Sequence, residues 1–293
     1  MLKAEQVSKS FGDTAVLRDL TIEIPDKTIF GLVGINGAGK STFLRLAAGV
    51  YQPDQGRITL NGQDTLKEDA VRKDISFVAD EAYYPLGATL GSVAGLYESM
   101  YDFDSALFET YCEMFELNRK TPMANYSKGM RRRASIILAL CTHPKLLLLD
   151  EAYDGLEPLA RLQFKRILAQ RLEEEEITVV ISSHNLRELE DICDSFGILE
   201  NGTIQRHGDL LESKGAINKY QMALEQELTK EDFKGLDILR FEKEGRVIQM
   251  VVRGEERAVM QVLQEHQPLF TDVLPVTFEE MFLYELEQRG DRS

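Results

Sequence analysis

A glycine-rich segment constrains the fold of this chain more than any other feature of its sequence. Residues 34–42 read GINGAGKST, directly after the apolar run at 29–33 and at the start of a helix-period segment at 40–49. A tight glycine turn leaves backbone N–H groups pointing inward, and the start of a helix adds partial positive charge. The segment therefore predicts a phosphate-binding loop between a strand and a helix.

The residues of this loop have expected parts in holding a nucleotide. Lys40 is expected to reach the β- and γ-phosphates, and the Ser41 hydroxyl is expected to bind Mg²⁺. The remaining expected phosphate contacts are Gly34, Asn36, Gly37, Ala38, Gly39 and Thr42. A chance glycine turn is the alternative, but it does not explain why every constrained position is filled between a strand and a helix.

A pair of acidic residues follows another apolar run. Four leucines at residues 146–149 lead into Asp150 and Glu151. A carboxylate at the end of a buried parallel strand lies at the mouth of a nucleotide crevice, where Asp150 can hold Mg²⁺. Glu151 is then placed to act as the general base that activates water. An acidic pair after an apolar strand is common by itself, so this interpretation depends on the glycine loop.

A histidine follows a third apolar run. Residues 178–181 are followed by Ser182, Ser183 and His184. A lone histidine is more often a structural hydrogen-bonding residue than a catalyst. We interpret His184 as catalytic because, at the crevice end of a core strand, its imidazole can contact the γ-phosphate and orient the attacking water.

Strand-like and helix-like runs alternate along most of the chain. Predicted strands lie at residues 21–24, 29–33, 75–78, 146–149, 178–181 and 196–199. Predicted helices lie at residues 40–49, 128–141, 158–174 and 186–193. The alternation indicates βαβ units and therefore an α/β fold on a mostly parallel sheet.

Two regions within the first 210 residues depart from this alternation. Residues 2–7 and 21–24, with a hairpin around 61–62, predict an antiparallel β patch beside the main sheet. Residues 81–125 are helical in pattern and, with the helix that follows, predict an inserted helical subdomain over about residues 81–140. We therefore expect residues 1–210 to form one nucleotide-binding domain.

The remainder of the chain has a pattern of its own. A hairpin around residues 244–245 and helices at 255–265 and 278–286 predict a small α+β domain over 211–293. No residue in this region has a recognisable chemical role, so its function stays open.

Charge and cysteine content exclude several classes of partner. Lys and Arg number 34 and Asp and Glu number 49, which gives a formal net charge of −15. Nucleic acids and anionic membrane surfaces bind basic faces, so neither is expected as the main partner. The three cysteines, Cys112, Cys141 and Cys193, show no CxxC spacing and indicate neither a disulfide framework nor a zinc site.

No segment of the sequence is typical of a signal peptide or a membrane span. The N-terminus reads MLKAEQVSKSF, and no run approaches the roughly twenty apolar residues needed to cross a bilayer. We expect a cytoplasmic protein, whose role at a membrane would depend on a partner.

Four motifs occur in an order that resembles the ATP-binding-cassette (ABC) ATPases. They are the glycine loop, YSKGM at residues 126–130, the apolar run with its acidic pair at 146–151, and His184. The combination covers roughly the first 210 residues and is far more specific than any single motif. It implies the P-loop NTPase fold, with ATP and Mg²⁺ as ligands. It also implies an ATPase that powers a separate integral membrane permease from the inner face of the cell membrane.

The YSKGM segment matches the family signature, usually written LSGGQ, with Ser127 and Gly129 retained. The resemblance implies that these two residues begin a helix and face the γ-phosphate held by the opposite subunit. ATP binding and dimerisation, as a homodimer or with a related ATPase, would then be one event. Taken alone, the SKG segment is more simply an ordinary helix cap.

Three further positions are assigned by the resemblance. Phe11 lies where the family stacks an aromatic ring on adenine, and the alternative is a buried core phenylalanine. Asp80 replaces a glutamine that touches Mg²⁺ or the water, and it is expected to accept Mg²⁺-bound water if the metal compensates its charge. Glu157 replaces an aspartate in the loop that crosses the dimer interface.

The acidic residue at position 80, the SKGM signature and the added C-terminal domain together resemble the exporter-type ATPases of bacitracin-resistance and related bacterial systems. Transport by export is therefore expected. A soluble ABC-type ATPase acting on DNA or ribosomes is one alternative, opposed by the acidic charge. A regulatory module that senses ATP is the other, opposed by intact Lys40, Glu151 and His184.

Overall fold

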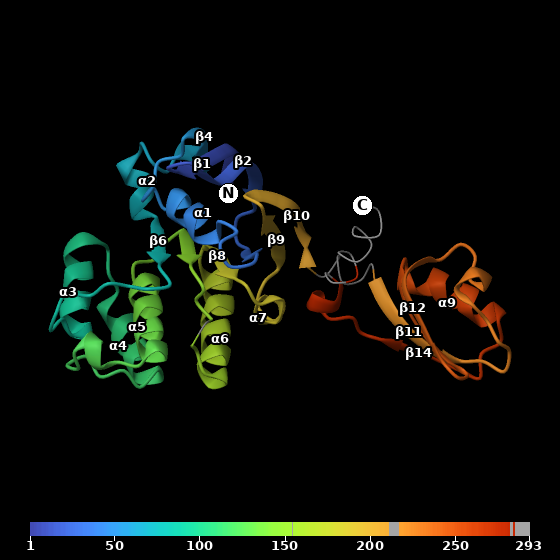
Figure 1. Cartoon of the computed structure of the whole chain (residues 1–293). Helices are drawn as coiled ribbons and strands as arrows, with labels where there is room; N and C mark the ends of the chain where they lie inside the picture. The colour runs from blue at the N-terminus through green and yellow to red at the C-terminus, as the bar shows by residue number, and fades with distance from the viewer. Residues whose placement is uncertain (154, 211–216, 282–283, 285–293) are drawn as a thin grey trace. The chain divides into compact units, whose positions relative to one another are not determined.

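The computed structural model describes residues 1–153, 155–210, 217–281 and 284, and the chain divides into two compact units, Met1–His207 and Gly208–Ser293. A six-stranded sheet forms the centre of the first unit (Figure 1). Its strands are β3 (Ile29–Val33), β6 (Ile75–Val78), β7 (Leu146–Leu149), β8 (Thr178–Ser183), β9 (Ser195–Glu200) and β10 (Thr203–Asp209). Their order across the sheet is β10-β9-β3-β8-β7-β6.

The inner strands of this sheet are parallel and buried. Strands β3, β7 and β8 are buried at every position, as continuous apolar runs covered on both faces should be. Val33 pairs with Ser183, and Leu149 pairs with both Ile181 and Val78. The carboxyl ends of four neighbouring strands therefore meet at one edge, which confirms the predicted mostly parallel sheet.

The predicted antiparallel patch is a separate four-stranded sheet. It consists of β1 (Leu2–Phe11), β2 (Thr14–Ile24), β4 (Gln55–Leu60) and β5 (Gln63–Asp64), in the order β2-β1-β4-β5. Asn61 and Gly62 join β4 to β5 with φ angles of 52° and 82°, the two positive values that a two-residue hairpin turn needs.

Helix α1 (Lys40–Ala47) packs against both sheets. Phe43 and Leu44 of this helix belong to one buried cluster with Leu2 of the antiparallel sheet and Leu148 of the six-stranded sheet. Figure 1 shows α1 between the two sheets. The glycine loop at the start of α1 is thereby fixed against both.

The predicted helical insert is present. It contains α3 (Leu90–Met100), α4 (Ser105–Met114), the short 3-10 helix η1 (Met123–Asn125) and α5 (Lys128–Leu140), and a short α2 (Asp69–Lys73) precedes β6. The side chains of Thr89, Asp104 and Ser127 accept backbone N–H groups at the starts of α3, α4 and α5. Two further helices, α6 (Pro158–Glu174) and α7 (Leu186–Glu190), flank β8 in the sequence.

The second unit is an antiparallel sheet with a helix. It contains β11 (Ile217–Ala223), β12 (Asp237–Glu244), β13 (Val247–Arg253) and β14 (Phe270–Leu274), in the order β12-β13-β11-β14, with a 3-10 helix η2 (Lys230–Asp232). Val259 and Leu263 of α9 (Glu256–Glu265) pack into its core. The hairpin and this helix follow the sequence prediction, whereas β11 and β14 were missed. The predicted helix at 278–286 lies partly outside the described residues.

The cysteines of the first unit are buried and reduced. Burial raises the pKa of Cys112 to about 11 and of Cys141 to about 12, and it also raises the pKa of Cys193. A thiol is the unreactive form of cysteine, so these side chains behave as small apolar core residues. Among the described residues, no helix is both long and apolar enough to cross a membrane.

Candidate functional site

The glycine loop adopts a conformation that only glycine allows at two positions. A Cβ on Gly34 would lie 2.5 Å from the Leu199 carbonyl oxygen, so the loop can leave β3 only without a side chain there. Gly39 caps the start of α1 with φ of 108°, a left-handed angle that other residues avoid. Ala38, Gly39 and Lys40 are buried, while Asn36 and Gly37 are exposed and Ser41 and Thr42 half-buried.

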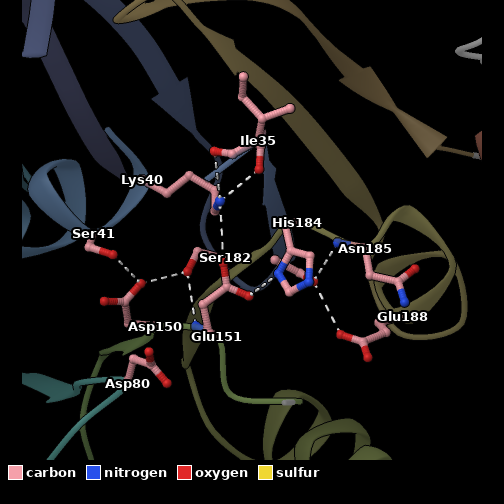
Figure 2. Close-up of polar contacts among 12 residues, drawn as sticks. Ile35, Lys40, Ser41, Asp80, Asp150, Glu151, Ser182, His184, Asn185 and Glu188 are labelled. Carbon is pink, nitrogen blue, oxygen red and sulfur yellow. Dashed lines mark hydrogen bonds and ion pairs between the residues drawn. The ribbon is translucent and has the colours of Figure 1, made fainter. Parts of the chain in front are cut away.

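The Lys40 side chain is buried, and its ammonium group is directed at the acidic pair. Its Nζ donates to the carbonyl oxygens of Gly34 at 2.6 Å and Ile35 at 3.3 Å. The same Nζ lies 3.2 Å from Glu151 Oε1, as Figure 2 shows. The side chain of Lys40 is only 5% exposed, so this ion pair is largely shielded from water.

Asp150 is fully buried and is held by two hydroxyl groups. Ser41 Oγ donates to Asp150 Oδ1 at 2.9 Å, and Ser182 Oγ donates to the same oxygen at 2.8 Å (Figure 2). The other oxygen, Oδ2, is buried and makes no hydrogen bond to any of the described residues. An ionised oxygen without a partner is costly in a protein interior. A hydroxyl beside such an oxygen is a donor set that suits Mg²⁺, so the residues present fit the expected metal.

Ser182 has a part that the sequence did not reveal. While its hydroxyl donates to Asp150, its oxygen accepts the backbone N–H of Glu151 at 3.0 Å. One buried side chain at the end of β8 thus fixes both members of the acidic pair. The signal in the sequence is a hydroxyl at the end of an otherwise apolar buried strand.

Glu151 joins Lys40 to His184. Its Oε2 lies 2.9 Å from His184 Nδ1, while its Oε1 faces Lys40. Glu151 has φ of 50°, a left-handed angle that is uncommon away from glycine and is often found at functional sites. The imidazole side chain is 51% exposed, so His184 is accessible at the edge of the site.

Phe11 is exposed, which excludes the buried-core alternative. The residue is 46% exposed at the end of β1, with the Tyr51 ring edge-on at 5.5 Å and Lys9 Nζ 5.5 Å from its centroid. Leu17, on the strand paired with β1, packs against Gly39. The hairpin that carries Phe11 therefore lies against the glycine loop.

Asp80 is bound by an arginine of α5. Its Oδ1 accepts from Arg132 Nη2 at 2.5 Å. Figure 2 shows Asp80 near Asp150, with no contact drawn between the two carboxylates. The predicted site residues Lys40, Ser41 and Asp80 therefore lie around one acidic pair.

Ser127 and Gly129 lie at the start of α5 and not among the residues around the acidic pair. Ser127 is exposed and accepts the Met130 N–H at 3.1 Å, so it caps α5. A Cβ on Gly129 would lie 2.5 Å from the Gly155 carbonyl oxygen. Within the described part of the chain, no hydrogen bond joins either residue to the glycine loop.

The chain is similar to known proteins in sequence and in fold. A family model described as "ABC transporter" matches residues 17–154. The ABC transporter ATP-binding protein YtrB of Bacillus subtilis (strain 168) is 26% identical over 97% of this chain and 97% of its own length. The lantibiotic transport ATP-binding protein SrtF of Streptococcus pyogenes is 30% identical over 70% of this chain and 89% of its own length. A solved structure of the ATP binding subunit of an ABC transporter superposes with a TM-score of 0.67 at 27% identity, covering 73% of this chain and 92% of that one.

Proposed function

This chain belongs to the ATP-binding subunits of ABC transporters, which hydrolyse ATP to drive transport, and we propose that it does so at the carboxyl edge of its six-stranded sheet. The glycine loop would bind the phosphates of ATP, with Lys40 against the β- and γ-phosphates. Ser41 and Asp150 would hold Mg²⁺, which supplies charge neutralisation at the phosphates when bound. The unpaired Oδ2 of Asp150 supports this assignment.

Glu151 and His184 are proposed to prepare the attacking water. Glu151 accepts the proton of the water as general base, because its carboxylate is anchored through its own backbone by Ser182. His184 shares the other carboxylate oxygen and is exposed, so its ring can contact both the γ-phosphate and the water. Positioning and charge stabilisation then supply most of the rate enhancement, as in phosphoryl transfer generally.

A second ATPase subunit is proposed to complete each site. Ser127 is exposed at the start of α5, where helix N–H groups and the partial positive charge favour an anion. We propose that Ser127 and Gly129 face the γ-phosphate bound by the partner, in a homodimer or with a related ATPase. Glu157 precedes α6 and would cross the same interface.

We propose that the chain powers export. SrtF is described as a lantibiotic transport protein. That description, together with the acidic residue at Asp80 and the SKGM signature, favours export in the manner of the bacitracin-resistance systems. The chain would act at the inner face of the cell membrane, attached through an integral membrane permease.

The Mg²⁺ site can be tested by metal removal. We expect phosphate release from ATP by the purified full-length chain to require Mg²⁺ and to stop when the metal is chelated. Asp150→Asn should lose the Mg²⁺-dependent rate, while Asp74→Asn, which alters a surface ion pair with Lys145, should retain it. Equal rates with and without chelator would contradict the proposal. ATP binding without turnover, even with the permease co-expressed, would favour an ATP-sensing module instead.

Adenine stacking can be tested at Phe11. Phe11→Ala should raise the KM for ATP about two- to tenfold with kcat little changed, because an aromatic contact is worth about 0.5–1.5 kcal/mol. Phe270→Ala is a matched control, since Phe270 is similarly exposed, at 42%, but lies on β14 of the second unit. A KM equal to that of the wild type would exclude Phe11 from the adenine site.

A further inference from the structure

One buried guanidinium group links the ends of two neighbouring strands. Arg132 Nη1 donates to the carbonyl oxygen of Ala79 at 2.9 Å and to that of Asp150 at 3.2 Å. Ala79 follows β6 and Asp150 follows β7. Together with the bond from Nη2 to Asp80, this gives Arg132 three partners at the carboxyl edge of the sheet.

Arg132 also belongs to the helix that begins at the signature segment. It lies within α5, which starts at Lys128 after the cap at Ser127 and packs against β6. A single side chain therefore ties α5 to the backbone of Asp150, whose carboxylate is the proposed Mg²⁺ ligand. Arginine suits this task because its rigid fork of donors binds several acceptors at once and stays charged.

The two ends of this ion pair differ in their access to solvent. The Arg132 side chain is 2% exposed, whereas that of Asp80 is 42% exposed. Both residues line a cavity of about 280 Å³, together with Lys128 and Ser135. Asp80 is therefore open to solvent, while Arg132 is almost fully buried beside it.

Arg132 compensates the charge of Asp80. The Asp80 carboxylate and the Asp150 carbonyl oxygen share one guanidinium group, so the two acidic residues lie close together, and like charges at one site are unfavourable unless a cation compensates them. Arg132 supplies that cation from within the chain at 2.5 Å.

We propose that Arg132 is a positioning residue for ATP hydrolysis. It holds the backbone at Asp150 and Glu151 in a fixed position relative to α5, so that a movement of Asp80 also moves this part of the backbone. The inference rests on the proposed roles of Asp150 and Glu151. Asp80 accordingly acts through Arg132 and not by holding Mg²⁺-bound water. Loss of the link should slow the chemical step and leave nucleotide binding by the glycine loop largely intact.

The test is a double-mutant cycle on the full-length chain, with kcat, the KM for ATP and the Mg²⁺ requirement measured for each variant. Arg132→Gln should lower kcat about tenfold or more, with KM changed less than about threefold. Asp80→Asn should lower kcat in the same direction, and the double variant should be no slower than Arg132→Gln alone. Arg132→Lys, which keeps the charge and loses the fork, should recover kcat only in part.

Arg171→Gln is the matched control. Arg171 is also buried and donates to a carboxylate, Glu175 at 2.6 Å, and to a backbone carbonyl, Leu140 at 2.9 Å, but none of its hydrogen bonds to the described residues reaches the proposed site. If Arg132 only stabilised the fold, Arg132→Gln and Arg171→Gln would both lower the melting temperature, and their kcat values would be similar to each other. That result would overturn the inference. Additive losses in the double variant, or a raised Mg²⁺ requirement in Asp80→Asn, would overturn it as well.

Two results distinguish a failure of the proposed site from a failure of the positioning role of Arg132. A wild-type chain that hydrolyses no ATP refutes the proposed site itself. Normal wild-type turnover with unchanged kcat in Arg132→Gln refutes only the positioning role. If Arg132→Gln fails to fold, Asp80→Asn decides the matter, because the partly exposed Asp80 can lose its charge without opening the core.

Discussion

Glu151→Gln should lower the turnover of ATP by about a hundredfold or more, the scale expected when a general base is removed. The substitution keeps the size of the side chain and its hydrogen bond to His184, so ATP should still bind. The variant should accumulate with bound ATP as a stable dimer, because the γ-phosphate that joins the two subunits is not removed. Steady-state phosphate release measures the rate, and light scattering with and without Mg·ATP measures the dimer.

Glu175→Gln provides the control for this variant. Glu175 resembles Glu151 in its contacts, with Arg171 Nη1 at 2.6 Å and His143 Nδ1 at 3.2 Å, but it lies at the end of α6. Its loss should leave turnover close to that of the wild type. Unchanged ATPase activity in Glu151→Gln would remove Glu151 from the role of base.

Lys40→Ala should weaken ATP binding by about ten- to a hundredfold, because hydrogen bonds to charged groups contribute about 1.5–3 kcal/mol each. The buried ammonium group already lies among the loop carbonyls and Glu151, so it needs little rearrangement to meet a phosphate. Fluorescence titration with a labelled ATP analogue measures the affinity.

Lys145→Ala serves as the control for Lys40. Lys145 also pairs with a carboxylate, Asp74 at 2.9 Å, but its side chain is 57% exposed, and such surface pairs contribute about 0–1 kcal/mol. Its removal should leave the ATP affinity unchanged. If both lysine variants bound ATP equally well, Lys40 would not contact the phosphates.

The inner strands of the main sheet could be predicted because both of their faces are buried. Runs such as Leu146–Leu149 are apolar on both faces, so their bounds follow directly from the sequence. Strands β11 and β14 were missed because their apolar side chains alternate irregularly with polar ones, and β14 has no fully buried position. β11 becomes a strand by pairing with β13 and β14, and β14 by pairing with β11, which a local pattern does not reveal.

The candidate site was predictable where a motif fixes the backbone and less so where distant side chains meet. The glycine loop, the acidic pair and His184 each follow a strand, so a parallel sheet brings them to one edge. The bonds made by Ser182 and Arg132 depend on atoms far apart in the sequence, such as Arg132 and Ala79. A local sequence pattern does not predict these hydrogen-bond partners, because a buried polar side chain can bond to many different groups that the fold brings near it.

Isothermal titration calorimetry of full-length Glu151→Gln with ATP tests the central claim most directly, since this variant should bind without turnover. The account predicts uptake of a single ATP per chain in the presence of Mg²⁺, with an affinity that falls when Mg²⁺ is chelated or when Lys40→Ala is added. No uptake with Mg²⁺ present, or uptake that is indifferent to both changes, would contradict the phosphate site at the start of α1.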